Sequence, residues 1–424
     1  MQKFLLSLVA AVSPLAFAQD APPPSISTPA AGASSSSVPS SMSLRQAIEL
    51  AMARNPELAA AVSEVDATGG VRLQAETRPN PSISYLLEDK RRETSTTTVL
   101  LNQPIELGGK RDARIAAADR GVDIAKFDLE ARRHAVRSVV VTAFFDLLAI
   151  QERIRVAETS LVLAQRSSQA ASQRVKAGKV SPVEETKARV AEAAVRIELA
   201  QVRGDEIGAR ARLGSAMGQR LGSTMLDGSL TNLPALLPAD TIQSRLDNAP
   251  ALRRAALEVE RRKALTALEN ARRVPDITLS LGSKRDPQVG QHQTVIGLSI
   301  PFPVFDRNQG NLLEALRRED KARDELLVVR SQIESEAIQA RERLAMSRLE
   351  AQSLAAEVLP GAQSAFDAAT RGFELGKFSF LEALDAQRTL LQARTQYLRA
   401  LAEAHRASAD LNRILGIDVL SGIQ

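Results

Sequence analysis

Histidine has the widest range of metal-binding and proton-transfer chemistry of any side chain, and this chain contains three, His134, His292 and His405. They are scattered along the sequence, and none of the HExxH, GxSxG or Walker A spacings occurs. Cysteine is absent, which excludes thiolate catalysis, cysteine-ligated metals, disulfides and lipid attachment at a cysteine. We therefore expect no enzyme activity, no cofactor and no dedicated metal site.

The charge of the chain is nearly balanced, with 55 basic and 50 acidic residues. A nucleic-acid-binding protein concentrates its basic residues into patches. The sequence therefore predicts no nucleic-acid partner, and the function must be sought in the structural elements that the chain encodes.

The first residues have the three parts of a cleavable secretory signal. Lys3 precedes a short apolar run and an A-x-A end at Ala18, so residues 1–18 are predicted to be removed. The run is too short to cross a bilayer comfortably, and no transmembrane helix is expected elsewhere. Residues 19–42, rich in Ser, Pro and Ala, are predicted to form a flexible linker, with structure beginning at the N-cap Ser43. The mature protein is thus periplasmic, secreted or an outer-membrane barrel.

The remainder of the chain repeats itself. Residues 178–181 read GKVS and residues 376–379 read GKFS, and other landmarks recur in the same order before and after them. Such self-similarity indicates a tandem duplication. We predict a first structural repeat at residues 43–224, a connector at 225–239 and a second repeat at 240–424, each with a helix, a β-hairpin and a long helical hairpin.

The hairpins are predicted at about residues 80–104 and 276–301. Their strands alternate apolar and polar residues, as in Ile83, Tyr85 and Leu87 against Ser82 and Ser84. One apolar and one polar face over about ten residues is typical of a transmembrane β-strand. A half-buried strand of a soluble sheet is the alternative for any single strand. Four such strands in two matched hairpins behind a signal peptide favour the membrane.

The helical stretches are unusually long. No proline occurs between Pro104 and Pro182, and a helix over residues 109–173 would be about 100 Å long. In the stretch after Pro182, apolar residues recur every seven positions, which implies a left-handed coiled coil. These are Val183, Val190 and Ile197 in the first repeat and Leu384, Leu391 and Leu398 in the second.

Four strands are too few for a membrane barrel, since the smallest such barrels have eight. An open sheet edge in lipid leaves unpaired backbone groups that cost several kcal/mol each. Several chains must therefore contribute strands to one barrel, and the residues alone permit a dimer or a trimer.

Two segments carry a resemblance to a known family. Residues 101–111 read LNQPIELGGKR, and residues 373–386 read FELGKFSFLEALDA. The chain resembles the TolC-family outer-membrane factors over residues 43–416, and specifically their CzcC-like branch, which serves heavy-metal efflux. The first segment resembles that branch's passage from strand to helix, and the second resembles the helix-hairpin turn shared by the whole family.

The resemblance implies a mainly α-helical chain with a transmembrane β-barrel. A homotrimer would close twelve strands in outer-membrane lipid and continue as an α-helical tunnel into the periplasm. The tunnel tip would dock on a periplasmic adaptor, a membrane fusion protein, with an inner-membrane RND pump beyond it. The expected adaptor contacts are the two repeat turns, with Gly178, Lys179, Ser181, Gly376, Lys377 and Ser379.

The resemblance also assigns an entrance. Acidic residues ring the periplasmic opening in the family, and Glu382 and Asp385 match them by position. Their i,i+3 spacing places them on one helix face, so a trimer would carry two carboxylate rings that attract cations. The alternative is an acidic pair favoured by the helix dipole. The first repeat has Glu184 but Lys187 at the matching places.

Some features depart from the family. Many relatives are lipid-anchored at a cysteine that this chain lacks, Phe378 stands where a gating Arg can occur, and aromatic residues are scarce at 3%. The resemblance favours a passive exit duct for metal cations such as cobalt, zinc and cadmium, or copper and silver. The alternatives are the same duct for drugs or type I secretion and, in another class, a periplasmic coiled-coil scaffold.

Overall fold

The computed structural model describes residues 41–89, 91, 94–287 and 290–417. The predicted signal peptide, residues 1–18, and the predicted linker up to residue 40 lie outside the described residues. Regular structure begins two residues before the expected start, with strand β1 (Ser41–Ser43). β1 pairs in parallel with β4 (Met225–Asp227), and Met42 is buried. The predicted linker and connector therefore each contribute a strand, because Met42 pairs with Leu226 beside the core.

Shorter helices precede each hairpin. Ser43 caps the first of them through a capping box with Gln46, and Asn55 caps the second by accepting from the backbone of Glu57. Pro56 and Pro250 each occupy a first-turn position, where the missing N–H has no helical partner to lose. These helices are α1 (Leu44–Arg54), α2 (Pro56–Glu76), α5 (Ala239–Leu246) and α6 (Pro250–Ala271).

The long helices form two helical hairpins. In the first repeat they are α3 (Lys110–Lys176) and α4 (Pro182–Met217). In the second they are α7 (Gln309–Ser353), a π-helical turn (Leu354–Val358), α8 (Leu359–Glu374) and α9 (Phe380–Leu415). The π-helical turn ends two residues before Pro360, which has no N–H to donate to the preceding turn. In the second repeat this stretch is divided into α7, the π-helical turn and α8. The matching stretch of the first repeat is the single 67-residue helix α3.

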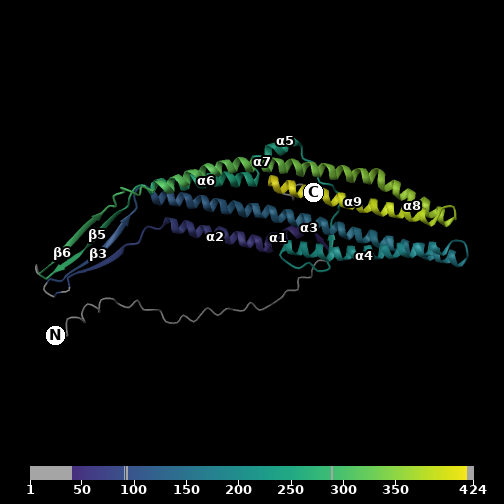
Figure 1. Cartoon of the computed structure of the whole chain (residues 1–424), viewed down its shortest axis with the longest axis horizontal. Coiled ribbons are helices and arrows are strands. Elements are labelled where there is room, and N and C mark those ends of the chain that lie inside the picture. Colours follow the sequence, from purple (N-terminus) through teal and green to yellow (C-terminus); the bar gives the residue numbers. More distant parts are fainter. Residues whose placement is uncertain (1–40, 90, 92–93, 288–289, 418–424) are drawn as a thin grey trace, which may run out of the picture. The chain divides into compact units, whose positions relative to one another are not determined.

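The two hairpins join into one antiparallel sheet. Its order is β2-β3-β5-β6, with β2 (Ser82–Glu88), β3 (Thr96–Ile105), β5 (Ile277–Asp286) and β6 (Gln291–Ser299). β3 pairs with β5 in a register that sets Leu101 opposite Leu281. Within the unit that begins at Ser41, this sheet lies at one end of the long helices and the two helical-hairpin turns lie at the other (Figure 1).

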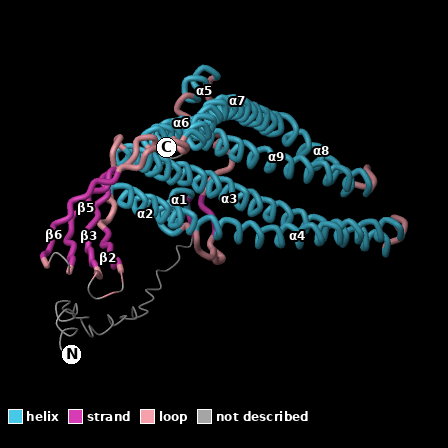
Figure 2. Tube along the Cα trace, turned by 60° about the vertical axis from the view of Figure 1, so that its left-hand side comes forward, coloured by secondary structure: helices cyan, strands magenta, loops and turns pink. Residues whose placement is uncertain are grey.

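The helices form two successive layers that share α3. Near the sheet, α3 packs between α2 and α6, and α6 packs on α7. Toward the hairpin turns, α3 packs between α4 and α9, and α9 packs on α8 (Figure 2). One edge of each layer therefore belongs to the first repeat and the other edge to the second.

The largest apolar core lies where α1, α3, α4 and α9 meet. Its fully buried side chains include Ile48, Phe144, Leu213 and Leu401. One window of α3 is apolar enough to cross a membrane by length and composition, but 61% of it is buried inside the protein. Packing in this core explains the hydropathy of α3.

His405 belongs to the same region. Its ring stacks on Phe145 with centroids 3.6 Å apart, and its Nε2 lies 3.1 Å from the carbonyl oxygen of Leu230, to which it donates. Burial lowers the pKa of His405, although the hydrogen bond opposes that shift. The imidazole is therefore a neutral core residue.

Candidate functional site

The two repeat turns have the same construction. Gly178 and Gly376 adopt positive φ values of 68° and 75°, the left-handed conformation that ends a helix. Ser181 and Ser379 then cap the next helix, accepting hydrogen bonds from the backbone N–H groups of Val183 and Glu382. The shared Gly-Lys-x-Ser sequence thus encodes a helix end followed directly by a helix start.

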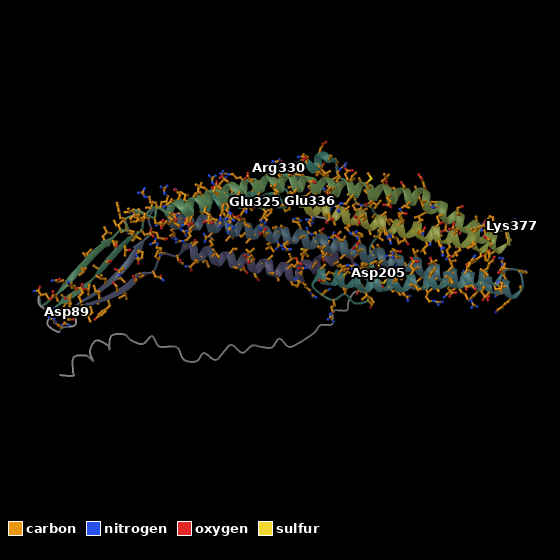
Figure 3. The ribbon with its side chains drawn as sticks, in the orientation of Figure 1. Asp89, Asp205, Glu325, Arg330, Glu336 and Lys377 are labelled. Atoms are coloured by element: carbon orange, nitrogen blue, oxygen red, sulfur yellow. The ribbon has the colours of Figure 1, made fainter. Side chains whose placement is uncertain are left out.

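Both turns are exposed at the end of the helices farthest from the sheet. Lys179 and Lys377 are exposed there, and Figure 3 shows Lys377 at this end, whereas Asp89 lies at the far end of the sheet. The six turn residues predicted to contact an adaptor therefore lie in two adjacent turns at one end of the chain. Their contact with an adaptor remains a prediction.

Arg174 joins the two turns. From the last turn of α3, its Nη2 donates to the carbonyl oxygens of Phe373 at 2.7 Å and Glu374 at 3.0 Å. Its guanidinium also lies 4.2 Å from the ring centroid of Phe373. These carbonyls are at the C-terminus of α8, where the helix dipole favours a cation. The contact was not predicted from the sequence.

An apolar cluster supports this contact. Phe373 and Phe380 meet edge to face, with ring centroids 5.8 Å apart, and they are buried with Ala171 and Ala188. Each repeat contributes two members, so the cluster and Arg174 hold the two turns together. We call the two turns with this cluster the tip.

Glu382 and Asp385 lie on the first turns of α9 and are both exposed. The Glu382 carboxylate accepts from the backbone N–H of Ser379 at 2.7 Å and from its hydroxyl at 3.0 Å, which closes a capping box. Glu382 therefore lies in the first turn of α9, where the alternative of an acidic pair favoured by the helix dipole places it, and it also makes capping contacts that were not predicted. Capping leaves its charge at the surface of the tip, and the entrance role of the pair remains a prediction.

The sheet has one apolar and one polar face. Ile83, Leu101, Leu281 and Ile296 lie directly opposite one another across the four strands and are all exposed, Ile83 by 77% and Ile296 by 80%. On the other face, Asn102 donates to Ser84 and accepts from Ser280, at 3.0 and 2.6 Å. An apolar row this exposed needs an apolar environment, whereas the polar face is suited to water.

The passage from sheet to helix is fixed by ion pairs. Arg114 binds both carboxylate oxygens of Glu106, at 2.6 and 3.1 Å, and also donates to the carbonyls of Ala75 and Thr77. The hydrogen bond to Glu106 raises the pKa of Arg114, so the guanidinium stays charged. This network anchors the start of α3 to the end of α2.

The same passage is joined to the second repeat. Lys110 Nζ lies 2.6 Å from Asp276, whose carboxylate also accepts from the backbone of Leu107. Gly108 has a φ of 70°, and an added Cβ would lie 2.7 Å from the side chain of Val274. The LNQPIELGGKR segment therefore fits a close contact between the repeats.

The histidines do not converge. His134 lies on α3, His405 is the core residue described above, and His292 lies within β6 opposite Arg285. Among the residues that the structure describes, no group of three or more His, Cys, Asp or Glu side chains is arranged to hold a metal ion. The arrangement offers exposed charge at the tip and a sheet with one apolar and one polar face.

The chain is similar to several known proteins over most of its length. The family described as outer membrane efflux protein matches residues 47–219 and 241–417. The cobalt-zinc-cadmium resistance protein CzcC of Cupriavidus metallidurans is 45% identical over 376 residues, covering 88% of this chain and 90% of that protein. The nickel-cobalt-cadmium resistance protein NccC of Alcaligenes xylosoxydans xylosoxydans is 27% identical, covering 69% of this chain and 67% of that protein.

Solved structures share the fold at lower identity. The outer membrane protein VceC from Vibrio cholerae superposes with a TM-score of 0.74 at 18% identity, covering 88% of this chain and 96% of that one. The transmembrane channel CusC gives 0.73 at 19% identity, covering 88% and 92%. The mainly helical chain with one four-stranded sheet therefore has the same fold as these solved structures.

Proposed function

The chain belongs to the outer membrane efflux protein family, and from this premise we propose that it is the exit duct of a tripartite system that exports heavy-metal cations. Its role as an outer-membrane efflux channel follows from family and fold together. The proposed cargo is supported by the 45% identity to a cobalt-zinc-cadmium resistance protein over 88% of the chain. Cobalt, zinc and cadmium are accordingly the proposed cargo, ahead of copper, silver or organic compounds.

We propose that the sheet is one part of a closed barrel. β2 and β6 are its two edges and run in opposite directions, so β6 of one chain can pair antiparallel with β2 of the next. The row from Ile83 to Ile296 would then face lipid, and Asn102 with its serine partners would face the channel. An eight-stranded barrel is filled by its own side chains, so a duct needs more than two chains. A homotrimer with twelve strands meets that need.

The tip completes the proposed duct in the periplasm. Glu382 and Asp385 would form two carboxylate rings at the entrance, because each copy contributes one exposed residue to each ring. The turn residues Lys179 and Lys377 and their neighbours would contact the adaptor, beyond which the RND pump supplies cargo. Residues 1–18 would direct export, residues 19–42 would act as a linker up to the start of β1 at Ser41, and the repeats 43–224 and 240–424 would each supply half of the wall.

Purification of the full-length chain from outer membranes tests this function. We expect a detergent-dependent oligomer that conducts cations in planar bilayers. A scaffold protein would instead be recovered as a soluble monomer without detergent after signal removal. That result would contradict the channel proposal. A conducting oligomer that restores the efflux of organic dyes from cells, but not of metal cations, would favour the alternative of a duct for drugs.

A further inference from the structure

The apolar face of the sheet ends in a polar patch. Arg285 lies four positions after Leu281 on β5, so both side chains point to the same face. His292 pairs directly opposite Arg285 on β6, and both side chains are exposed. Thr97 of β3 lies on the other side of Arg285, and Ser283 precedes it by two positions on β5. Four side chains that can donate hydrogen bonds therefore meet on this face, and we call them the Arg285 patch.

The charge of the patch is not balanced by its own chain. Within the four strands that the structure describes, Arg285 is the only charged residue on the apolar face. The neighbouring Lys284 lies on the polar face, where it pairs with Glu88 at 3.8 Å. Arg285 has no such ion pair with any described residue. The apolar face therefore presents one positive charge that is open to an anion from outside the chain.

The patch lies at the end of the sheet farthest from the helices. Arg285 and His292 are next to the turn between β5 and β6, whereas Ile277, the first residue of β5, adjoins the helical part (Figure 1). Eight positions separate Ile277 from Arg285. They span about 27 Å along the strand, or about 20 Å of height at a tilt of about 40°, and the apolar band of an outer-membrane barrel is roughly 25 Å tall. The patch therefore lies near the outer edge of such a band, where a charged side chain costs far less than at its middle.

The side chains below the patch fit this height. Leu281, Ile296 and Leu298 are exposed by 57%, 80% and 61% on the same face. Tyr85, exposed by 65%, lies in the same row of the sheet as Ser283, at the lower edge of the patch. Tyrosine is common at the boundary between acyl chains and headgroups, because its ring is apolar and its hydroxyl is polar. The face thus changes from aliphatic to aromatic and then to cationic toward its outer end.

The chemistry of the outer leaflet supplies the anion. In the proposed duct the helices lie in the periplasm, so the far end of the sheet lies in the outer leaflet. That leaflet consists largely of lipopolysaccharide, whose lipid A part carries phosphate groups next to its acyl chains. A guanidinium binds phosphate through two parallel hydrogen bonds, and hydroxyl and imidazole donors add to the contact. We propose that the Arg285 patch binds a phosphate of lipid A while the acyl chains cover Leu281 and Ile296.

This inference rests on the proposed outer-membrane duct and names a lipid that the duct binds. The next copy offers no competing anion on this face. In the proposed barrel β6 pairs with β2 of the next copy, and the residues of β2 on the apolar face are Ile83, Tyr85 and Leu87. None of these is acidic, so the positive charge of Arg285 stays available to a lipid phosphate.

Titration of the detergent-purified, full-length oligomer with lipid A tests the patch, and native mass spectrometry counts the lipid molecules that each oligomer retains. Bisphosphorylated lipid A should bind at least tenfold more tightly than the same lipid with its phosphates removed. Arg285→Gln should abolish most of this difference and leave the binding of the dephosphorylated lipid unchanged. Lys284→Gln is the matched control, because it removes a positive charge at the adjacent position but from the polar face. It should bind both lipids as the wild type does.

Three results would overturn the proposal. The first is equal binding of the two lipids by the wild type, and the second is wild-type binding by Arg285→Gln. The third is displacement of phosphorylated lipid A by millimolar inorganic phosphate, which would identify a site for free anions instead of a lipid. Planar-bilayer recordings of the same preparations separate these failures from a failure of the proposed function. A conducting oligomer without phosphate-dependent lipid binding leaves the duct intact, whereas a preparation that forms no conducting oligomer contradicts the duct and the outer-leaflet position of the patch.

Discussion

The guanidinium of Arg174 lies 2.7 Å from the carbonyl oxygen of Phe373 and covers the aromatic ring of the same residue, although the two residues belong to different repeats. The first helical hairpin thereby caps the C-terminus of α8 in the second. Because α8 packs mainly on α9, this contact and the cluster around Phe380 connect the two hairpins at the tip. Arg174 therefore provides the polar part of the connection between the two turns, and the cluster provides the apolar part.

We expect Arg174→Ala to loosen the tip. Charge-assisted hydrogen bonds contribute about 1.5–3 kcal/mol each, so their loss should weaken the contact between the two turns. Planar-bilayer recordings should show larger or longer openings than the wild type. Arg189→Ala is the matched control, since Arg189 pairs with Glu185 on its own helix. Equal conductance for both variants would contradict a role of Arg174 in holding the two turns together.

We expect Glu382→Gln combined with Asp385→Asn to reduce cation selectivity. Gln can keep the capping box with Ser379, so α9 should remain folded while two charges per copy disappear. The measurement is the reversal potential in a salt gradient across a planar bilayer. A control with Asp367→Asn, on α8, removes a charge away from these positions. An unchanged reversal potential in the double variant would assign the pair to helix capping alone.

His405 predicts a pH dependence of stability. Above about pH 6.5, the ordinary histidine pKa, the imidazole is neutral in both the folded and the unfolded chain. Below that pH, the unfolded chain takes up a proton that the buried ring resists, because its pKa is lowered. The free energy of unfolding should therefore fall as the pH drops below about 6.5.

Denaturant titrations at several pH values measure this effect. His405→Gln retains an N–H that can reach the Leu230 carbonyl but cannot titrate, so its stability should depend less on pH than that of the wild type. His292→Gln, at an exposed strand position, should behave like the wild type. The same acid loss in His405→Gln as in the wild type would place the titrating group elsewhere.

The passage from sheet to helix should be sensitive to Arg114. Arg114→Met leaves the partly buried Glu106 without its bidentate partner, which we expect to destabilise the fold by about 1–3 kcal/mol. Adding Glu106→Gln should restore part of the loss, because the unpaired charge is removed. Thermal unfolding followed by circular dichroism reports both changes. Fully additive losses would show that the two side chains act independently.

The sequence predicted features with a long or repeated pattern. The family expected from residues 101–111 and 373–386 is confirmed by the family match and by the 45% identity to CzcC. The two hairpins and the long helices appear in the structure because alternation and heptads extend over many residues. By contrast, β1 and β4 have three residues each, which is too short for a visible alternation.

Contacts between the repeats could not be predicted. Arg174 with Phe373, and Lys110 with Asp276, depend on how two distant segments pack, and neither has a local signal. The π-helical turn did have one, because Pro360 interrupts an otherwise helical stretch. For Glu382, the sequence analysis predicted an entrance role or an acidic pair favoured by the helix dipole, and the structure adds the capping contacts with Ser379.

Metal accumulation in cells tests the central claim most directly. A strain that keeps the cognate pump and adaptor but lacks this chain should accumulate cobalt, zinc and cadmium, and expression of the chain should return all three to wild-type levels. Metal levels that stay high while the chain is present in the outer membrane would contradict a heavy-metal duct.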